Sequence, residues 1–169
     1  MGRLRFIVLI AVALLLQACA ISYKFNGASI DYSNTKSIAI AEFPNQAALV
    51  YPQLSSMLSE TIRDIYSRQT RLEVTRRNGD LELEGEITGY TLTAMAIAAD
   101  SYAAETKLTI TVRVRFTNNN APEENFEKTY TAYQTFDSNR LLTDVQEELC
   151  TTMTQEIAES IYNDTVAKW

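Results

Sequence analysis

The chain has 169 residues, enough for one domain with a substantial core, and its 15 Lys and Arg against 21 Asp and Glu give a net charge of −6. It contains no histidine, which excludes a histidine-dependent catalytic triad, a histidine zinc site and a histidine general base. The five glycines, three prolines and 46% hydrophobic residues indicate a regular globular domain rather than a disordered chain.

The first 18 residues have the pattern of a cleaved secretory signal. Arg3 and Arg5 give a positively charged start, and residues 6–16 form an uninterrupted apolar run that is too short to cross a bilayer. The sequence LQAC at residues 16–19 resembles a bacterial lipobox, which predicts that Cys19 is lipidated and becomes the first residue of the mature chain. Two or more acyl chains would anchor the protein stably to a membrane. The alternative is an ordinary secreted protein in which Cys19 has no role.

The mature chain predicted in this way is strongly acidic. Removal of residues 1–18 takes away two arginines and no acidic residue, so 13 basic residues face 21 acidic ones, a net charge of −8. This balance argues against an extensive nucleic-acid interface, which needs clustered positive charge. Residues 19–36, rich in Ser, Asn and Tyr, are predicted to be the lipidated N-terminus and a polar tether, and residues 37–169 to be a single domain.

The first elements of this domain are a strand and a helix. Residues 37–43 are apolar at both odd and even positions, the pattern of a strand that is buried on both faces. After Pro52, apolar residues recur at helical spacing and predict an amphipathic helix, with the stripe Leu54, Met57, Leu58, Ile62, Ile65 and Tyr66. Leu72 and Val74 mark a second short strand, and the following Asn78-Gly79 predicts a β-hairpin turn.

Two longer strands follow, in which apolar and polar residues alternate strictly. Residues 81–89 and 108–116 show this pattern, which predicts a sheet with one face on a core and the other in water. If the two strands are neighbours, the glutamates of the first and the arginines of the second share the wet face and pair across it. The apolar parity switches after Gly89, which predicts a bulge there.

The chain is predicted to end with a strand and a long helix. Residues 118–120 (Asn-Asn-Asn) predict a turn, and residues 126–136 a last strand. Residues 137–139 (Asp-Ser-Asn) are expected to cap a C-terminal helix with the apolar stripe Leu142, Val145, Leu149, Met153, Ile157 and Ile161. The whole order predicts an α/β (α+β) two-layer sandwich, a mixed parallel and antiparallel sheet of about five strands with two helices packed on one face.

Catalytic, metal and cofactor chemistry is not predicted. Glu82, Glu84 and Glu86 point the same way from one strand, but alternate positions lie about 7 Å apart, too far for three carboxylates to hold one ion unaided. A solvated strand face paired with arginines is the favoured interpretation. Cys150 falls on the apolar stripe of the last helix, which predicts a buried, unreactive thiol. There is no Gly-rich phosphate loop and no Gly-x-Ser-x-Gly motif, so we expect a protein that is not an enzyme.

Two surfaces are candidates for binding. One is a basic cluster, with Arg113 and Arg115 nearby, that consists of Arg63, Arg68, Arg71, Arg76 and Arg77. The candidate contacts with the phosphates of a lipid headgroup are Arg68, Arg71, Arg76 and Arg77. The alternative for these residues is a set of ordinary solvated arginines at helix and strand ends. The other is the apolar loop at residues 44–52, whose candidate partner contacts are Asn45, Ala48, Leu49, Val50 and Tyr51. Such a loop either tucks under a helix or contacts a partner.

Several stretches, taken together, resemble the LptE lipoproteins of Bacteroidetes-type bacteria. They are FPNQAALVYP at 43–52, QTRL at 69–72, GDLELEGEITGY at 79–90, LTITVRVRFTN at 108–118, LLTDV at 141–145 and AKW at 167–169. The resemblance implies a periplasm-facing outer-membrane lipoprotein of lipopolysaccharide export. Members of this family associate with the large β-barrel LptD, partly inside it as a plug, and bind lipopolysaccharide. The alternative is a stand-alone envelope lipoprotein that binds lipid or glycan.

Overall fold

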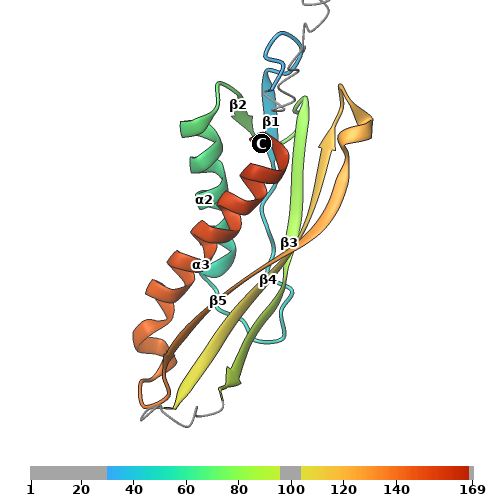
Figure 1. The fold of residues 1–169 in the computed structure, drawn as a ribbon. Coiled ribbons are helices and arrows are strands. Elements are labelled where there is room, and N and C mark those ends of the chain that lie inside the picture. The colour runs from blue at the N-terminus through green and yellow to red at the C-terminus, as the bar shows by residue number, and fades with distance from the viewer. Residues whose placement is uncertain (1–29, 96–103, 168–169) are drawn as a thin grey trace, which may run out of the picture.

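The computed structural model describes residues 30–95 and 104–167, which form one open sheet with two helices on a single face (Figure 1). The strand order is β2-β1-β3-β4-β5. In chain order the elements are β1 (Ser37–Ile40), α2 (Leu54–Gln69), β2 (Glu73–Thr75), β3 (Leu81–Ala94), β4 (Glu105–Asn118), the 3₁₀ turn η2 (Pro122–Glu124), β5 (Phe126–Asp137) and α3 (Leu142–Thr165). The predicted two-layer sandwich with a mixed sheet is confirmed. The predicted signal peptide, Cys19 and most of the tether lie outside the described residues.

One half of the sheet is parallel. β1 pairs in parallel with β2 on one side and with β3 on the other. Val74 and Leu81 are both register partners of Ile38, so residues 76–80 carry the chain across β1 instead of turning back. The predicted Asn78-Gly79 hairpin is therefore wrong. The strongly apolar β1 lies between β2 and β3, where its backbone pairs along both edges, and Ile38, Ala39 and Ile40 are all buried.

The Asn-Gly pair still has a structural role in this crossing. Asn78 has a φ of 59°, a conformation that Asn tolerates better than most residues. A Cβ on Gly79 would lie 2.5 Å from the carbonyl oxygen of Leu81 and 2.9 Å from the carbonyl carbon of Ile38. Only glycine can therefore pass this close to the backbone of β1.

The other half of the sheet is an antiparallel meander of long strands. β3 pairs with β4, and β4 with β5, over most of their lengths. The register of the β3–β4 pair shifts between Ile87 and Gly89, so the predicted bulge is confirmed, with Thr88 as the additional residue. Because of this shift, Tyr90 turns into the core, and Leu92, two residues further along the same face, is 41% exposed.

The core lies between the sheet and the two helices. α2 and α3 present the predicted apolar stripes to it, with Met57, Leu142 and Leu149 only partly buried. Between the helices, the buried hydroxyl of Tyr66 is hydrogen-bonded to that of Thr165, and the Tyr66 ring meets Tyr162 edge-on at 5.4 Å between centroids. This pair joins the C-terminal ends of α2 and α3.

The start of α3 differs from the prediction. The N-cap position is Leu141, which makes no side-chain capping bond. β5 continues to Asp137, whose carboxylate accepts hydrogen bonds of 2.8 Å from the backbone N–H and the side-chain amide of Asn139. The predicted cap at residues 137–139 is therefore wrong, because these residues form the strand end and a local Asx turn instead.

Candidate functional site

Part of the apolar loop at residues 44–52 is packed against the domain. Asn45 forms an isolated bridge with Ile87 of β3, and its Oδ1 accepts a hydrogen bond of 3.0 Å from the backbone N–H of Ala47, which is buried. Tyr51 is half-buried, and its ring stacks on Tyr90 with 6.5 Å between the centroids. The predicted contacts Asn45 and Tyr51 therefore hold the two ends of the loop to the sheet.

The middle of the same loop is presented to solvent. Ala48 is exposed, and Leu49 and Val50 are 52% and 63% exposed. A single exposed apolar residue is ordinary on a protein surface, but here three lie consecutively on a loop that is fixed at both ends. Ala48, Leu49 and Val50 are thus the part of this loop that a partner can reach.

The four arginines predicted to meet a headgroup do not form one patch. Arg68 is ion-paired with Asp64, one turn earlier on α2, at 2.7 Å. Arg71 lies over the ring of Tyr32, 5.9 Å from its centroid. These two cations therefore already have intramolecular partners.

Arg76 and Arg77 instead line a hollow together with Arg63 of α2. This hollow has a volume of about 370 Å³, and its wall also contains Glu42 and Glu60. The Nε of Arg63 is buried and has no hydrogen-bond partner among the described residues. A buried guanidinium donor without a partner is costly, and an anionic oxygen would satisfy it. The sequence placed all three arginines in one cluster, but the crossing of residues 76–80 over β1 is what brings them together.

The glutamates of β3 lie on the sheet face that the helices leave open. Glu86 is ion-paired with Arg113 of β4, and Arg115 lies 3.4 Å from Glu127 of β5. The predicted pairing of this face across strands is confirmed for Glu86. In residues 30–95 and 104–167, no group of three Asp, Glu or Cys side chains is placed to hold a metal ion.

Cys150 is fully buried on the apolar stripe of α3, as predicted. Burial raises the pKa of its thiol to about 11, since the charged thiolate is poorly solvated there. Its Sγ lies 3.9 Å from the hydroxyl of Tyr90, which also accepts a hydrogen bond of 2.7 Å from the side chain of Gln146. A buried thiol with a raised pKa is a poor nucleophile.

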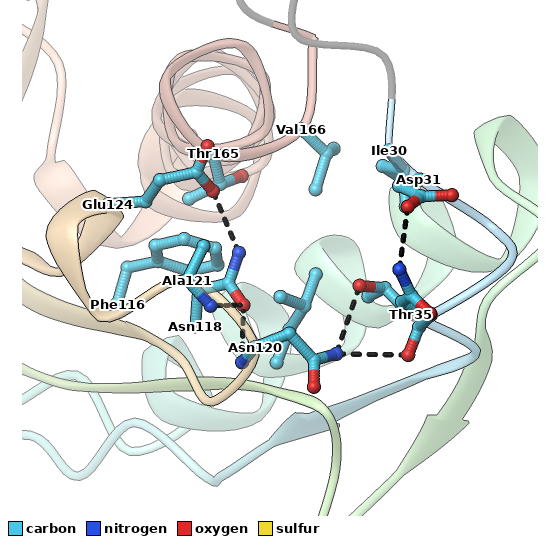
Figure 2. Close-up of a pocket in the computed structure, with 12 residues that line it drawn as sticks. Ile30, Asp31, Thr35, Phe116, Asn118, Asn120, Ala121, Glu124, Thr165 and Val166 are labelled. Carbon is cyan, nitrogen blue, oxygen red and sulfur yellow. Dashed lines mark hydrogen bonds between the residues drawn. The ribbon is translucent and has the colours of Figure 1, made fainter.

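A small pocket of about 260 Å³ lies where both ends of the described chain meet, between Ile30 and Val166 (Figure 2). Asn118 organises its wall, because its side-chain amide donates to Glu124 at 2.7 Å and its Oδ1 accepts from the backbone N–H groups of Asn120 and Ala121. These polar groups of the wall are therefore engaged with one another rather than aimed at a ligand.

The same pocket shows how the N-terminal segment is attached. The side-chain amide of Asn120 donates to the carbonyl oxygen of Asn34 at 3.0 Å and to the hydroxyl of Thr35 at 3.2 Å. The sequence predicted only a turn at residues 118–120. A tertiary contact between residues more than 80 positions apart leaves no periodic signal in the sequence. The role of Asn120 in holding the N-terminal segment therefore could not be predicted.

Comparisons with known proteins identify the family. The model of the LptE lipopolysaccharide-assembly family matches residues 35–165. Among solved structures, the hypothetical protein CT253 from Chlamydia trachomatis is similar, with a TM-score of 0.54 and 12% identity over 79% of this chain and 98% of that chain. A putative neuraminyllactose-binding hemagglutinin homolog from Helicobacter pylori has a TM-score of 0.51 and 9% identity, over 78% and 86% of the two chains. A comparison with curated proteins found no match.

The solved structures support a shared fold, whereas the family model supports membership of a family. At 9% and 12% identity, the two solved structures share the fold with this chain and say nothing further about its function. Neither helix in the described part of the chain is long and apolar enough to span a bilayer. The family model, by contrast, covers most of the chain, including every described strand and the whole of α2 and α3. The chain belongs to the LptE lipopolysaccharide-assembly family.

Proposed function

We propose that this protein is an outer-membrane lipoprotein that assembles with the β-barrel LptD, plugs that barrel and binds lipopolysaccharide. The family match over residues 35–165 carries the proposal. The exposed Ala48, Leu49 and Val50 provide a small apolar surface of the kind that contacts a partner. In this account the protein acts by binding and has no catalytic role or cofactor.

The anchor is part of the same proposal. Residues 1–18 are removed as a signal peptide, Cys19 carries the acyl chains, and residues 37–169 act as a single domain facing the periplasm. The lipobox-like LQAC and the absence of an acidic residue in Ala20-Ile21-Ser22 support it. We expect mass spectrometry of the mature protein to find acyl groups on Cys19, and Cys19→Ala to leave an uncleaved precursor. An unmodified Cys19 in the wild-type protein would overturn the anchor.

Affinity purification tests the partnership. The full lipidated chain, tagged at its C-terminus and extracted from membranes in mild detergent, is expected to bring down a large β-barrel in equal molar amount. The same extraction from cells that express the tagged Cys19→Ala precursor is the control for nonspecific capture of abundant barrels. Repeated recovery of the lipoprotein without a stoichiometric barrel would contradict the proposed function.

A second candidate function, a stand-alone lipoprotein that binds lipid or glycan, is favoured by the hollow that Arg63, Arg76 and Arg77 line. It predicts that Arg76→Glu with Arg77→Glu weakens binding to vesicles containing lipid A by at least about tenfold, as expected for the loss of two charge-assisted contacts. Arg68→Gln is the matched control, because Arg68 is already paired with Asp64. Equal binding by the double variant and the control would exclude this hollow as the site.

A further inference from the structure

The outer edge of β5 has no partner strand among the described residues. β5 is the last strand in the sheet order and pairs only with β4. The N–H of Ser138 donates to the carbonyl oxygen of Ala104 at 2.9 Å, so residues 104 and 138 form a hydrogen-bonded pair of the antiparallel ladder. Because such pairs alternate, the even-numbered residues of β5 bond to β4, and the odd-numbered ones direct their N–H and C=O groups outward.

This edge is long and lacks the features that usually protect an edge strand. β5 has 12 residues, whereas β2, at the other edge of the sheet, has three. Residues 129–136, TYTAYQTF, contain no proline, no glycine and no charged side chain, and are rich in residues with high β-propensity. Natural proteins normally shorten, charge or kink such an edge to prevent pairing with another chain.

The neighbouring helix determines which strands can approach this edge. α3 packs over one face of β5, where Lys128 and Tyr130 both bond to Asp164. α3 contains no Lys or Arg, and its exposed acidic side chains are Asp144, Glu147, Glu148, Glu156 and Glu159. A strand with acidic side chains would be repelled by this helix, and one with basic side chains attracted.

We propose that the free edge of β5 accepts an extended strand of a partner protein by backbone pairing, and that this strand carries basic side chains. Backbone hydrogen bonds supply the affinity, as in other cases of strand addition, and the acidic α3 selects the charge. A second copy of this chain is a poor occupant, because pairing of two β5 edges would bring two acidic α3 helices together. The proposal goes beyond the assembly function proposed above and does not depend on it.

Residue-by-residue amide exchange on the full lipidated chain in detergent micelles tests the proposal. The probe is the nine-residue peptide Thr-Lys-Thr-Val-Lys-Val-Thr-Lys-Thr, and its counterpart with glutamate in place of each lysine is the charge control. In the free protein, we expect the outward amides of Thr129, Thr131 and Tyr133 to exchange fast, and those of Tyr130 and Ala132 to be protected. The basic peptide should slow the outward amides at least about tenfold and bind at least about tenfold more tightly than the acidic one.

A pair of variants separates backbone pairing from side-chain contact. Thr131→Pro removes one outward N–H and leaves the bonds to β4 in place, since proline is tolerated at an edge position of this kind. Thr131→Val changes the same side chain and keeps the N–H. We expect the proline variant to lose peptide binding and the valine variant to bind within about twofold of the wild type. Protection of the Tyr130 and Ala132 amides shows that a variant is folded. If Thr131→Pro does not fold, Thr129→Pro is used in its place.

Several results would overturn the proposal. Protection of the outward amides in the dilute free protein would mean that the chain covers its own edge. Protection that grows with protein concentration, without peptide, would assign the edge to a second copy. Absence of protection by the basic peptide, equal affinity for the two peptides, or unchanged binding to a folded proline variant would contradict a basic partner strand directly.

Discussion

Phe43 and Gly85 join the parallel half of the sheet to α2. The backbone N–H of Phe43 donates to the hydroxyl of Ser59 at 3.0 Å, and the hydroxyl of Ser55 donates to the carbonyl oxygen of Phe43 at 2.7 Å. The ring of Phe43 is fully buried and lies against Gly85 of β3, where any side chain would occupy the same space. The packing of α2 on the sheet therefore requires a glycine at position 85.

Gly85→Ala should destabilise the fold by about 1–3 kcal/mol, the usual cost of overpacking a filled core. The new Cβ would lie 2.5 Å from the carbonyl oxygen of Arg113 and would collide with the Phe43 ring. Gly89→Ala is the matched control, since its Cβ would meet only Thr111 at 3.1 Å or more. Urea unfolding of the two variants compares their free energies of unfolding, and an equal loss in both would refute the role given to Gly85.

The buried Cys150 should make the protein lose stability in alkali. Burial raises the pKa of its thiol from the ordinary value of 9.0 to about 11 in the fold, so the unfolded chain releases the thiol proton first. Stability is therefore complete below pH 9 and falls as pH rises toward 11, by on the order of 1 kcal/mol between pH 9 and 10. Cys150→Ala should reduce this slope, and the part that remains belongs to buried tyrosines such as Tyr66 and Tyr90, whose pKa burial also raises. Urea unfolding at pH 8, 9 and 10 measures it, and equal slopes in the two proteins would rule out the thiol as the cause.

The connection from β2 to β3, which crosses β1, is fastened by Asp80. Its Oδ2 accepts three hydrogen bonds at the start of β1, from the backbone N–H of Lys36 at 2.8 Å, and from the N–H and the hydroxyl of Ser37 at 3.0 Å. The hydrogen bond from Lys36 is the largest cause that lowers the pKa of this carboxyl group below 3.8. Asp80 thus fastens the end of the crossing to the strand that it passes.

Asp80→Ala should cost about 1–3 kcal/mol, because the two backbone donors would lose a charged acceptor. Asp80→Asn keeps one acceptor oxygen and should cost less. The ionised carboxylate of Asp80 stabilises the fold above pH 3.8, and this contribution is lost as pH falls through the lowered pKa. Since neither variant has this carboxylate, the stability of both should depend less on pH between pH 5 and 3 than that of the wild type. Thermal unfolding across that range tests this, and an identical acid profile for wild type and Asp80→Ala would contradict it.

Periodic elements could be predicted from the sequence, whereas their connections could not. β3, β4, α2 and α3 each bury one face, so their apolar residues repeat with the period of the element. The Asn78-Gly79 turn and the cap at residues 137–139 were misplaced, because local propensity cannot reveal that β1 separates β2 from β3 or that β5 continues to Asp137. The same limitation applied to the candidate site, where Arg68 and Arg71 have intramolecular partners while Arg76 and Arg77 line the hollow beside α2.

The whole molecule has two distinct ends (Figure 1). The first and last described residues lie together at one end, where Ile30 and Val166 line one pocket. The tip of the β3–β4 pair and the start of α3 lie at the other, and this end carries the exposed apolar residues Leu92, Met95 and Leu141. The exposed apolar residues therefore gather at the end opposite to the one where the described chain begins.

Site-specific photocrosslinking in living cells can show whether this chain works in a complex with a β-barrel, as proposed. A photoreactive amino acid at Leu49 or Val50, the exposed part of the apolar loop, should give one discrete product with the mass of this chain plus one large barrel. The same amino acid at Gln155, exposed on the acidic surface of α3, is the control. A barrel adduct from the loop positions is the result that the account predicts, and loop positions that give no adduct in cells expressing the barrel would contradict it.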